Sequence, residues 1–138
     1  MLPVIAIDSN IWCYYFDESC KEHSKIAEAV ERALAKERIL LNTIIVMEVS
    51  HFLVKNLGPS VGKEKIEIFL SLPMTILDLT FSSLHGSIEL LCAYSHEGSG
   101  GRDATVLDAM KRAGINKIMT HDQAFKKIDW LEVIDPLA

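Results

Sequence analysis

The chain has 138 residues, of which 49% are hydrophobic and 24% charged, and its formal net charge is −5. This length suits a single domain, residues 1–138, and the apolar content excludes a disordered or low-complexity chain. Three cysteines without C-x-x-C spacing exclude a disulfide framework and a zinc knuckle and favour a reducing, cytoplasmic location, while the absence of a signal peptide and of long apolar runs argues against a membrane protein.

Short β-branched runs alternate with helical stretches along the chain, which is typical of an α/β domain with a mainly parallel sheet. In chain order, strands are predicted at residues 4–7, 39–41, 74–78, 117–119 and 131–134. Helices are predicted at residues 11–16, 21–36, 44–56, 61–72, 81–94, 103–113 and 122–127. Thr43 is expected to cap the helix at 44–56, and segment 95–101 is expected to be a flexible loop.

Two acidic residues in the first half occupy unusual positions. Asp8 directly follows an apolar strand, and ligand sites gather at the carboxyl ends of parallel strands, although an aspartate there can also cap the next helix. Glu48 lies in an otherwise apolar helix, so an inward-pointing side chain needs a metal, another cation or a raised pKa to compensate its charge. The alternative is that Glu48 shares a narrow exposed stripe with Ser50 or His51 and Lys55.

Two further acids begin helices in the last third of the chain. Asp103 follows a glycine-rich segment, and Asp122 follows the strand at 117–119, so either residue can be a helix cap or part of a site. If all four acids cluster without a metal, their mutual repulsion is expected to raise the pKa of at least one of them.

Together these acids and their neighbours resemble the PIN-domain nucleases, including the VapC-type toxins. The resemblance covers nearly the whole chain and implies a three-layer α/β/α sandwich with a central, mainly parallel five-stranded sheet. The motifs that carry it are Asp8-x-Asn10, Val46-Met47-Glu48-Val49, Gly101-Arg102-Asp103-Ala104 and Thr120-His121-Asp122-Gln123-Ala124-Phe125.

The resemblance also implies an activity, the hydrolysis of phosphodiester bonds in single-stranded RNA with Mg²⁺ or Mn²⁺. The acids that it assigns to catalysis and to the metal are Asp8, Glu48, Asp103 and Asp122. Asn10 and Thr120 match the polar positions that support such a cluster. His51 and His121 match no family position, and Asp108, an extra acid five positions after Asp103, is expected outside the metal site.

Carboxylates suit this chemistry because they are the hard ligands that Mg²⁺ and Mn²⁺ prefer, and a divalent ion supplies both positive charge and an activated water. The five histidines show no H-E-x-x-H spacing, which argues against a zinc hydrolase, and the glycine-rich segment lacks the ending of a P-loop. The last third of the chain is locally basic, and Arg102, Lys126 and Lys127 are the expected contacts to the RNA backbone. The number of metal ions stays open.

The short, single-domain chain favours the toxin of a toxin–antitoxin pair, with an antitoxin protein as partner, over a housekeeping RNA-processing nuclease. A catalytically silent PIN-like interaction module is a further alternative, and an aspartyl phosphotransfer domain is disfavoured because Asn10 replaces the second acid of D-x-D. A homodimer is expected, because the first half is richer in aromatic side chains than one small core needs. These aromatic residues are Trp12, Tyr14, Tyr15, Phe16 and Phe52.

Overall fold

The computed structural model describes residues 2–138, which contain a central sheet of five parallel strands in the order β3-β2-β1-β4-β5. The strands are β1 (Val4–Ile7), β2 (Arg38–Asn42), β3 (Met74–Leu77), β4 (Lys117–Met119) and β5 (Glu132–Ile134). The α-helices are α1 (Ser9–Phe16), α2 (His23–Lys36), α3 (Thr43–Leu57), α4 (Pro59–Ser71), α5 (Phe81–Tyr94) and α6 (Gly101–Ala113). Two short 3-10 helices, η1 (Ser95–Glu97) and η2 (Gln123–Lys127), complete the fold.

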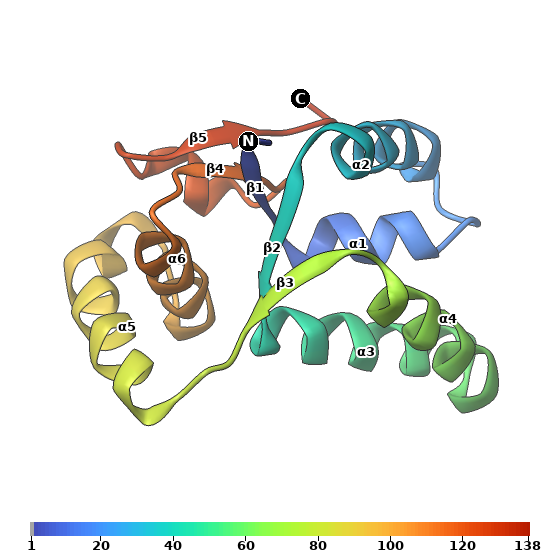
Figure 1. Ribbon diagram of the computed structural model, residues 1–138, viewed down its shortest axis with the longest axis horizontal. Helices are drawn as coiled ribbons and strands as arrows, with labels where there is room; N and C mark the ends of the chain where they lie inside the picture. The colour runs from blue at the N-terminus through green and yellow to red at the C-terminus, as the bar shows by residue number, and fades with distance from the viewer. Residues whose placement is uncertain (1) are drawn as a thin grey trace.

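Helices cover both faces of the sheet. In Figure 1, α5 and α6 lie on one side of the strands, and α1, α2, α3 and α4 lie on the other. The three-layer α/β/α sandwich with a parallel sheet is therefore confirmed. Within residues 2–138, no helix is both long enough and apolar enough to cross a membrane.

The aromatic residues of α1 belong to the core. Trp12 is fully buried, its ring centroid lies 4.9 Å from that of Phe69, and Phe16 stacks beside it at 6.3 Å. Tyr15 meets the indole edge-on at 6.0 Å. These contacts contradict the idea that the aromatic side chains exceed what the core can use, so the argument for a dimer must rest on other surfaces.

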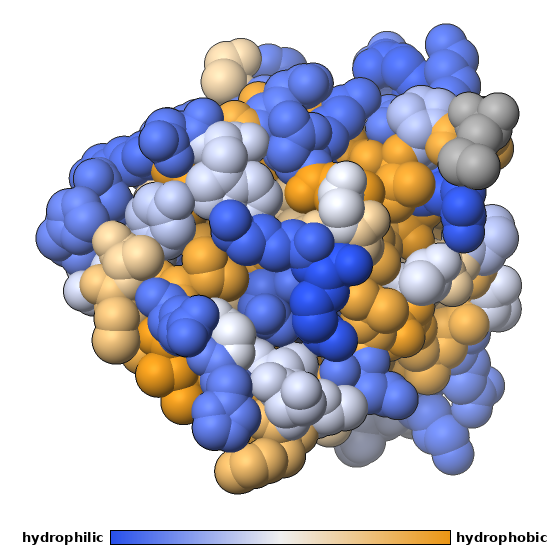
Figure 2. Space-filling model, turned by 60° about the vertical axis from the view of Figure 1, so that its left-hand side comes forward, coloured by the Kyte–Doolittle hydropathy of each residue, from blue (hydrophilic) through white to orange (hydrophobic). Residues whose placement is uncertain are grey.

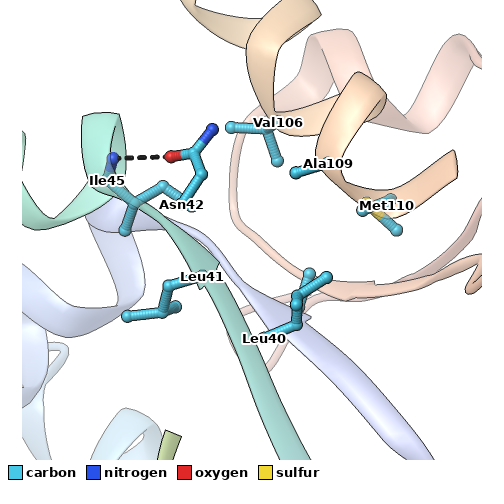
Figure 3. A pocket seen from close by; sticks show the side chains of 8 residues that line it. Leu40, Leu41, Asn42, Ile45, Val106, Ala109 and Met110 are labelled. Atoms are coloured by element: carbon cyan, nitrogen blue, oxygen red, sulfur yellow. Dashed lines mark hydrogen bonds between the residues drawn. The ribbon is translucent and has the colours of Figure 1, made fainter. Parts of the chain in front are cut away.

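The helix α6 is buried on nearly all sides, because α5 separates it from solvent and the sheet lies beneath it. Figure 3 shows the apolar seam between α6 and β2, where Leu40, Val106, Ala109 and Met110 meet. The side chains leave no room there for a water molecule. This packing fixes the start of α6 relative to the sheet edge that carries the acids.

Asn42, rather than the predicted Thr43, caps α3. Its side-chain oxygen accepts a hydrogen bond from the backbone N–H of Ile45 at 2.9 Å, as the dashed line in Figure 3 marks. The Thr43 hydroxyl instead accepts from the backbone N–H of Leu79 at 3.1 Å. The expectation of Thr43 as the cap was wrong because the buried strand β2 runs one residue further than its apolar pattern suggests.

Candidate functional site

The carboxyl edge of the sheet places Asp8 beside Thr120. The strands β1 and β4 are neighbours, and the backbone N–H of Asp8 donates to the carbonyl of Met119 at 3.0 Å. The Thr120 hydroxyl then donates to Oδ2 of Asp8 at 2.7 Å, across 112 positions of sequence. Asp8 is fully buried, and its Oδ1 also accepts from the backbone N–H of Ser9 at 2.8 Å. Asp8 thus caps α1 and also lies at the sheet edge where the sequence predicts a ligand site.

Thr120 also joins this edge to Asn10 and Asp122. Its hydroxyl oxygen accepts from Nδ2 of Asn10 at 3.5 Å and from the backbone N–H of Asp122 at 3.0 Å. The side-chain oxygen of Asn10 accepts from the backbone N–H of His121 at 3.3 Å. The loop after β4 is therefore anchored to the start of α1 at two consecutive residues, Thr120 and His121.

Asp122 also caps the helix that follows it. Its Oδ1 accepts from the backbone N–H of Ala124 at 3.0 Å, as the capping interpretation predicts. Asp122 is nevertheless close enough to Asp103 for its negative charge to raise the pKa of that carboxyl. The two interpretations of Asp122 are compatible.

The helix α6 delivers Asp103 and Arg102 to the same edge. Gly100, and not Asp103, is the N-cap residue, so Asp103 lies in the first turn with its carboxylate available for other contacts. The neighbouring Arg102 turns its guanidinium inward, and Nη1 donates to Oδ1 of Asp103 at 2.5 Å.

Arg102 ties together acids from three separate parts of the chain. Its Nε donates to Oε1 of Glu48 at 2.6 Å, and Nη2 donates to Oδ1 of Asp8 and, at 2.9 Å, to the hydroxyl of Ser9. The Glu48 side chain is 38% exposed and that of Arg102 is 26% exposed. The structure thus provides the charge of Glu48 with a compensating cation, Arg102. The Glu48 carboxylate is not confined to an exposed stripe of α3.

Burial and the neighbouring charges together shift the pKa of Asp103 and of Arg102. Burial raises the pKa of Asp103, and the charges of Asp122 and Asp8 add to this effect, although Arg102 opposes it. Burial alone would lower the pKa of Arg102, but the carboxylates of Asp8 and Glu48 outweigh it and raise that pKa above its ordinary value. One buried acid with a raised pKa agrees with the expected repulsion within the cluster, but burial is the largest cause.

The thiol of Cys13 on α1 responds to the same negative field. Burial, with the charges of Glu48 and Asp8, raises its pKa to about 12. Cys13 therefore stays a neutral thiol at physiological pH. Because a thiol must lose its proton to bind a metal tightly, Cys13 is poorly suited to be a metal ligand.

The donor set fits a hard divalent cation. Oxygen atoms of four carboxylates come from the ends of β1 and β4, from α3 and from α6, and the Arg102 guanidinium shows that three of them already converge on one positive charge. Within residues 2–138, no three acidic, histidine or cysteine side chains are positioned to share one ion as they stand. Instead, three of the carboxylates surround the guanidinium of Arg102.

The predicted RNA-contacting bases lie in different settings. Arg102 is engaged by the acids, whereas the ammonium of Lys126 pairs with Asp135 at 2.7 Å. Lys127 is exposed at the end of η2. Asp108 lies outside the acidic group, as expected, and pairs with Arg112 at 2.9 Å.

The sequence analysis missed Asn42 and the pair formed by His121 and Asp135. The amide of Asn42 caps α3, which carries Glu48, and its Nδ2 donates to the Thr105 hydroxyl of α6 at 3.3 Å. A polar residue that ends an apolar strand was the signal available for Asn42. No local pattern links His121 to Asp135, because the contact joins two loops that follow neighbouring strands.

A model of the PIN-domain family matches residues 5–131. The chain belongs to the PIN-domain family. The resemblance drawn from the acidic motifs is thus confirmed, and membership of this family supports a nuclease activity. No curated protein matches the chain significantly in sequence.

Solved PIN-domain structures share the fold at low sequence identity. VapBC2 from Rickettsia felis, bound to a DNA fragment from the promoter, aligns with a TM-score of 0.75 and 19% identity over 96% of this chain and 98% of that chain. VapC20 from Mycobacterium tuberculosis, a toxin that cleaves the sarcin-ricin loop, aligns with a TM-score of 0.76 and 17% identity over 88% of this chain and 92% of that chain. FitAcB from Neisseria gonorrhoeae aligns with a TM-score of 0.73 and 17% identity over 96% of this chain and 98% of that chain.

Proposed function

We propose that this PIN-domain protein is an endoribonuclease that hydrolyses phosphodiester bonds of single-stranded RNA with Mg²⁺ or Mn²⁺. The observation that carries the proposal is that Arg102 bonds to Asp8, Glu48 and Asp103, which come from three separate elements. Asp122 is near enough to Asp103 for its charge to raise the pKa of that carboxyl. Grouping carboxylates in this way costs folding free energy, and a function that uses a bound cation would explain why they are grouped.

In this proposal the four acids hold the divalent ion. When bound, the ion supplies positive charge against the scissile phosphate and an attacking water at neutral pH. Thr120 keeps Asp8 oriented through its 2.7 Å hydrogen bond, and Asn10 fixes the loop that bears Asp122. Arg102, once released from the acids, remains attached to the start of α6 and can donate to a phosphate oxygen.

We assign the protein to the toxins of toxin–antitoxin pairs, with a cytoplasmic RNA target and an antitoxin protein as its partner. The support is the fold, which VapBC2 and FitAcB share over nearly their whole lengths. A housekeeping nuclease is the alternative. Expression of the toxin alone should arrest growth, and the product of a small adjacent gene should relieve the arrest; harmless expression of an active nuclease would favour the alternative.

The catalytic proposal is tested with labelled single-stranded RNA and Mn²⁺ or Mg²⁺. Wild type should cleave the RNA, EDTA should stop the reaction, and Asp8→Asn should remove the activity. Asp78→Asn is the matched control, because Asp78 also follows a strand of the same sheet but is exposed and has no contact with the acidic group. Equal cleavage by wild type and Asp8→Asn would show that the activity belongs to a contaminant.

We also propose that the protein is a homodimer, and α5 offers the surface. Phe81, Leu84 and Ile88 are exposed at helical spacing on α5, with 79% of Phe81 accessible. Figure 2 shows the side of the molecule that carries α5 and α6, where apolar areas reach the surface between hydrophilic ones.

The dimer is tested by light scattering, which should give twice the chain mass. Phe81→Glu should halve this mass, while Leu70→Glu, at an exposed apolar position of α4, should leave it unchanged.

A further inference from the structure

Arg102 donates nearly all of its N–H groups to the acids and to the neighbouring Ser9. A guanidinium has five N–H groups. The Nε of Arg102 donates to Glu48, and its Nη1 donates to Asp103. Its Nη2 donates to Asp8 and to the Ser9 hydroxyl, so four of the five groups are in use within residues 2–138. A bidentate contact to a phosphate needs two parallel N–H groups, and Arg102 can make that contact only after it releases an acid.

Open surface lies beside Arg102 at the start of α6. Gly100 and Gly101 are exposed, and a Cβ added to either glycine would meet no atom of the described chain, residues 2–138, within 4 Å. The Arg102 side chain is itself 26% exposed. Because this side chain is long and has many rotamers, the guanidinium can turn from the acids toward this surface while α6 stays in place.

The attraction that holds Arg102 is electrostatic. The carboxylates of Asp8 and Glu48 keep the pKa of Arg102 above its ordinary value, although burial lowers it. Asp103 also contacts the guanidinium, and the charge of Asp122 reaches Asp103. A divalent cation held by the same acids offsets two of their negative charges and repels the guanidinium directly. The hold of the acids on Arg102 is therefore weaker when such a cation is bound.

A phosphate of RNA is the alternative acceptor for Arg102. Arginine binds phosphate oxygens through two parallel N–H groups, and such contacts are among the strongest hydrogen bonds of proteins. Asp103 and Arg102 both lie in the first turn of α6, so a phosphate brought to the acids lies beside the residue that carries the guanidinium. Without a divalent cation the acids repel this phosphate. Metal and phosphate thus favour the same change in Arg102.

We propose that Arg102 is a switch that couples metal binding to RNA binding: it is bonded to the acids in the metal-free protein, and it is released to bind an RNA phosphate when the acids hold a divalent ion. This inference rests on the proposed ribonuclease function and adds to it the regulation of the site. The coupling is reciprocal, so the ion and the phosphate each raise the affinity for the other by the same factor. The rival explanation is that Arg102 stays bonded to the acids in every state and only reduces their repulsion.

The position of Arg102 is followed by heteronuclear NMR of its Nε–H, whose signal is assigned by its loss in Arg102→Gln. In EDTA this proton should exchange slowly with water, because Glu48 accepts it. Mg²⁺, at a concentration that saturates binding in a calorimetric titration, should make the exchange about tenfold faster, because a hydrogen bond to a charged group is lost. The Nε–H of Arg112, which Asp108 accepts outside the acidic group, is the matched control and should not change.

An Arg102 signal that stays unchanged when Mg²⁺ is bound would overturn the switch and leave the proposed function standing. A calorimetric titration that shows no binding of Mg²⁺ or Mn²⁺ would overturn both. The two failures are therefore distinguishable.

The coupling is measured with adenosine 5′-monophosphate (AMP), which carries a phosphate but no phosphodiester bond to cleave. Wild type should bind AMP about tenfold more tightly in saturating Mn²⁺ than in EDTA. Arg102→Gln should lose most of this gain, and Arg102→Lys should recover only part of it, because lysine keeps the charge but lacks the parallel N–H groups. Arg112→Gln, the matched control, should keep the whole gain, and in EDTA it should bind AMP as Arg102→Gln does.

An Arg102→Gln protein that keeps the whole gain would show that the ion alone attracts the phosphate, and the switch would be overturned. Coupling with AMP in a wild-type protein that leaves labelled RNA intact would overturn the proposed function and leave the switch standing.

Discussion

The Nε of Arg102 donates to Oε1 of Glu48 at 2.6 Å, which joins the first turn of α6 to the second turn of α3 across 54 positions of sequence. The same guanidinium reaches Asp8 and Asp103, so a side chain from the protein itself provides the counter-charge of the acidic group. A divalent ion that binds these acids must therefore compete with Arg102.

Replacing Arg102 should separate the stability of the metal-free protein from its affinity for metal. Arg102→Gln should lower the metal-free melting temperature, because the carboxylates lose their counter-charge. The variant should bind Mn²⁺ about tenfold more tightly, a change of about 1.4 kcal/mol, because the ion no longer displaces a cation. Calorimetric titration with Mn²⁺ measures the affinity. Arg112→Gln, which breaks a pair outside the acidic group, is the matched control; weaker Mn²⁺ binding by Arg102→Gln would mean that Arg102 helps to assemble the ion site.

The raised pKa of Asp103 predicts the pH dependence of the metal-free protein. A group with a raised pKa in the folded state holds its proton more tightly there, so its contribution to stability is present below the unfolded pKa of about 4 and is lost as pH rises through the folded value. Asp103→Asn removes this loss. Its melting temperature in EDTA should exceed that of wild type at pH 7 by a few degrees and match it near pH 3. A variant that melts below wild type at pH 7 would show that the bond to Arg102 outweighs burial.

Asn42 should be more important for stability than its position at a strand end suggests. Asn42→Ala removes the N-cap of α3 and the link to Thr105, and loss of a cap alone typically costs about 1 kcal/mol. For a chain of this length this corresponds to a fall in melting temperature of roughly 3 °C or more. Thermal unfolding should show this fall, and Asn56→Ala, which removes an exposed side chain at the end of α3, should change the melting temperature by much less.

The contact between α5 and α6 depends on Gly86. A Cβ added to Gly86 would clash with Oδ1 of Asp108, a carboxylate that Arg112 holds in place. Gly86→Ala should therefore destabilise the protein, although alanine is normally favoured over glycine in a helix by about 1 kcal/mol. In an Asp108→Ala background the same substitution should become neutral or stabilising. A double-mutant cycle of unfolding free energies measures this reversal, and simple additivity would show that Asp108 moves aside freely.

Local sequence patterns were enough to locate the strands of the sheet and to single out the acidic residues at unusual positions. Apolar runs gave all five strands, and the ends of two of these runs marked Asp8 and Asp122. Glu48 stood out because it is a charge among apolar neighbours. The membership of these residues in a metal site stays a prediction.

Other features depend on contacts that no local pattern contains. The inward turn of Arg102 follows from the juxtaposition of α6 with α1 and α3, and from the sequence Arg102 was expected to face RNA. The segment 95–101, expected to be a flexible loop, contains η1 and leads into the first residue of α6. The pairing of His121 with Asp135 requires β4 and β5 to lie side by side.

The bond between Thr120 and Asp8 also has a consequence for the newly made protein. Asp8 is synthesised before the hydroxyl that orients it, which comes 112 positions later in the chain. A nascent chain whose β4 has not yet emerged from the ribosome carries three of the four acids but lacks the strand that lies beside β1. A chain whose synthesis stops before β4 therefore lacks both Asp122 and the hydroxyl that orients Asp8, and we expect it to show no nuclease activity.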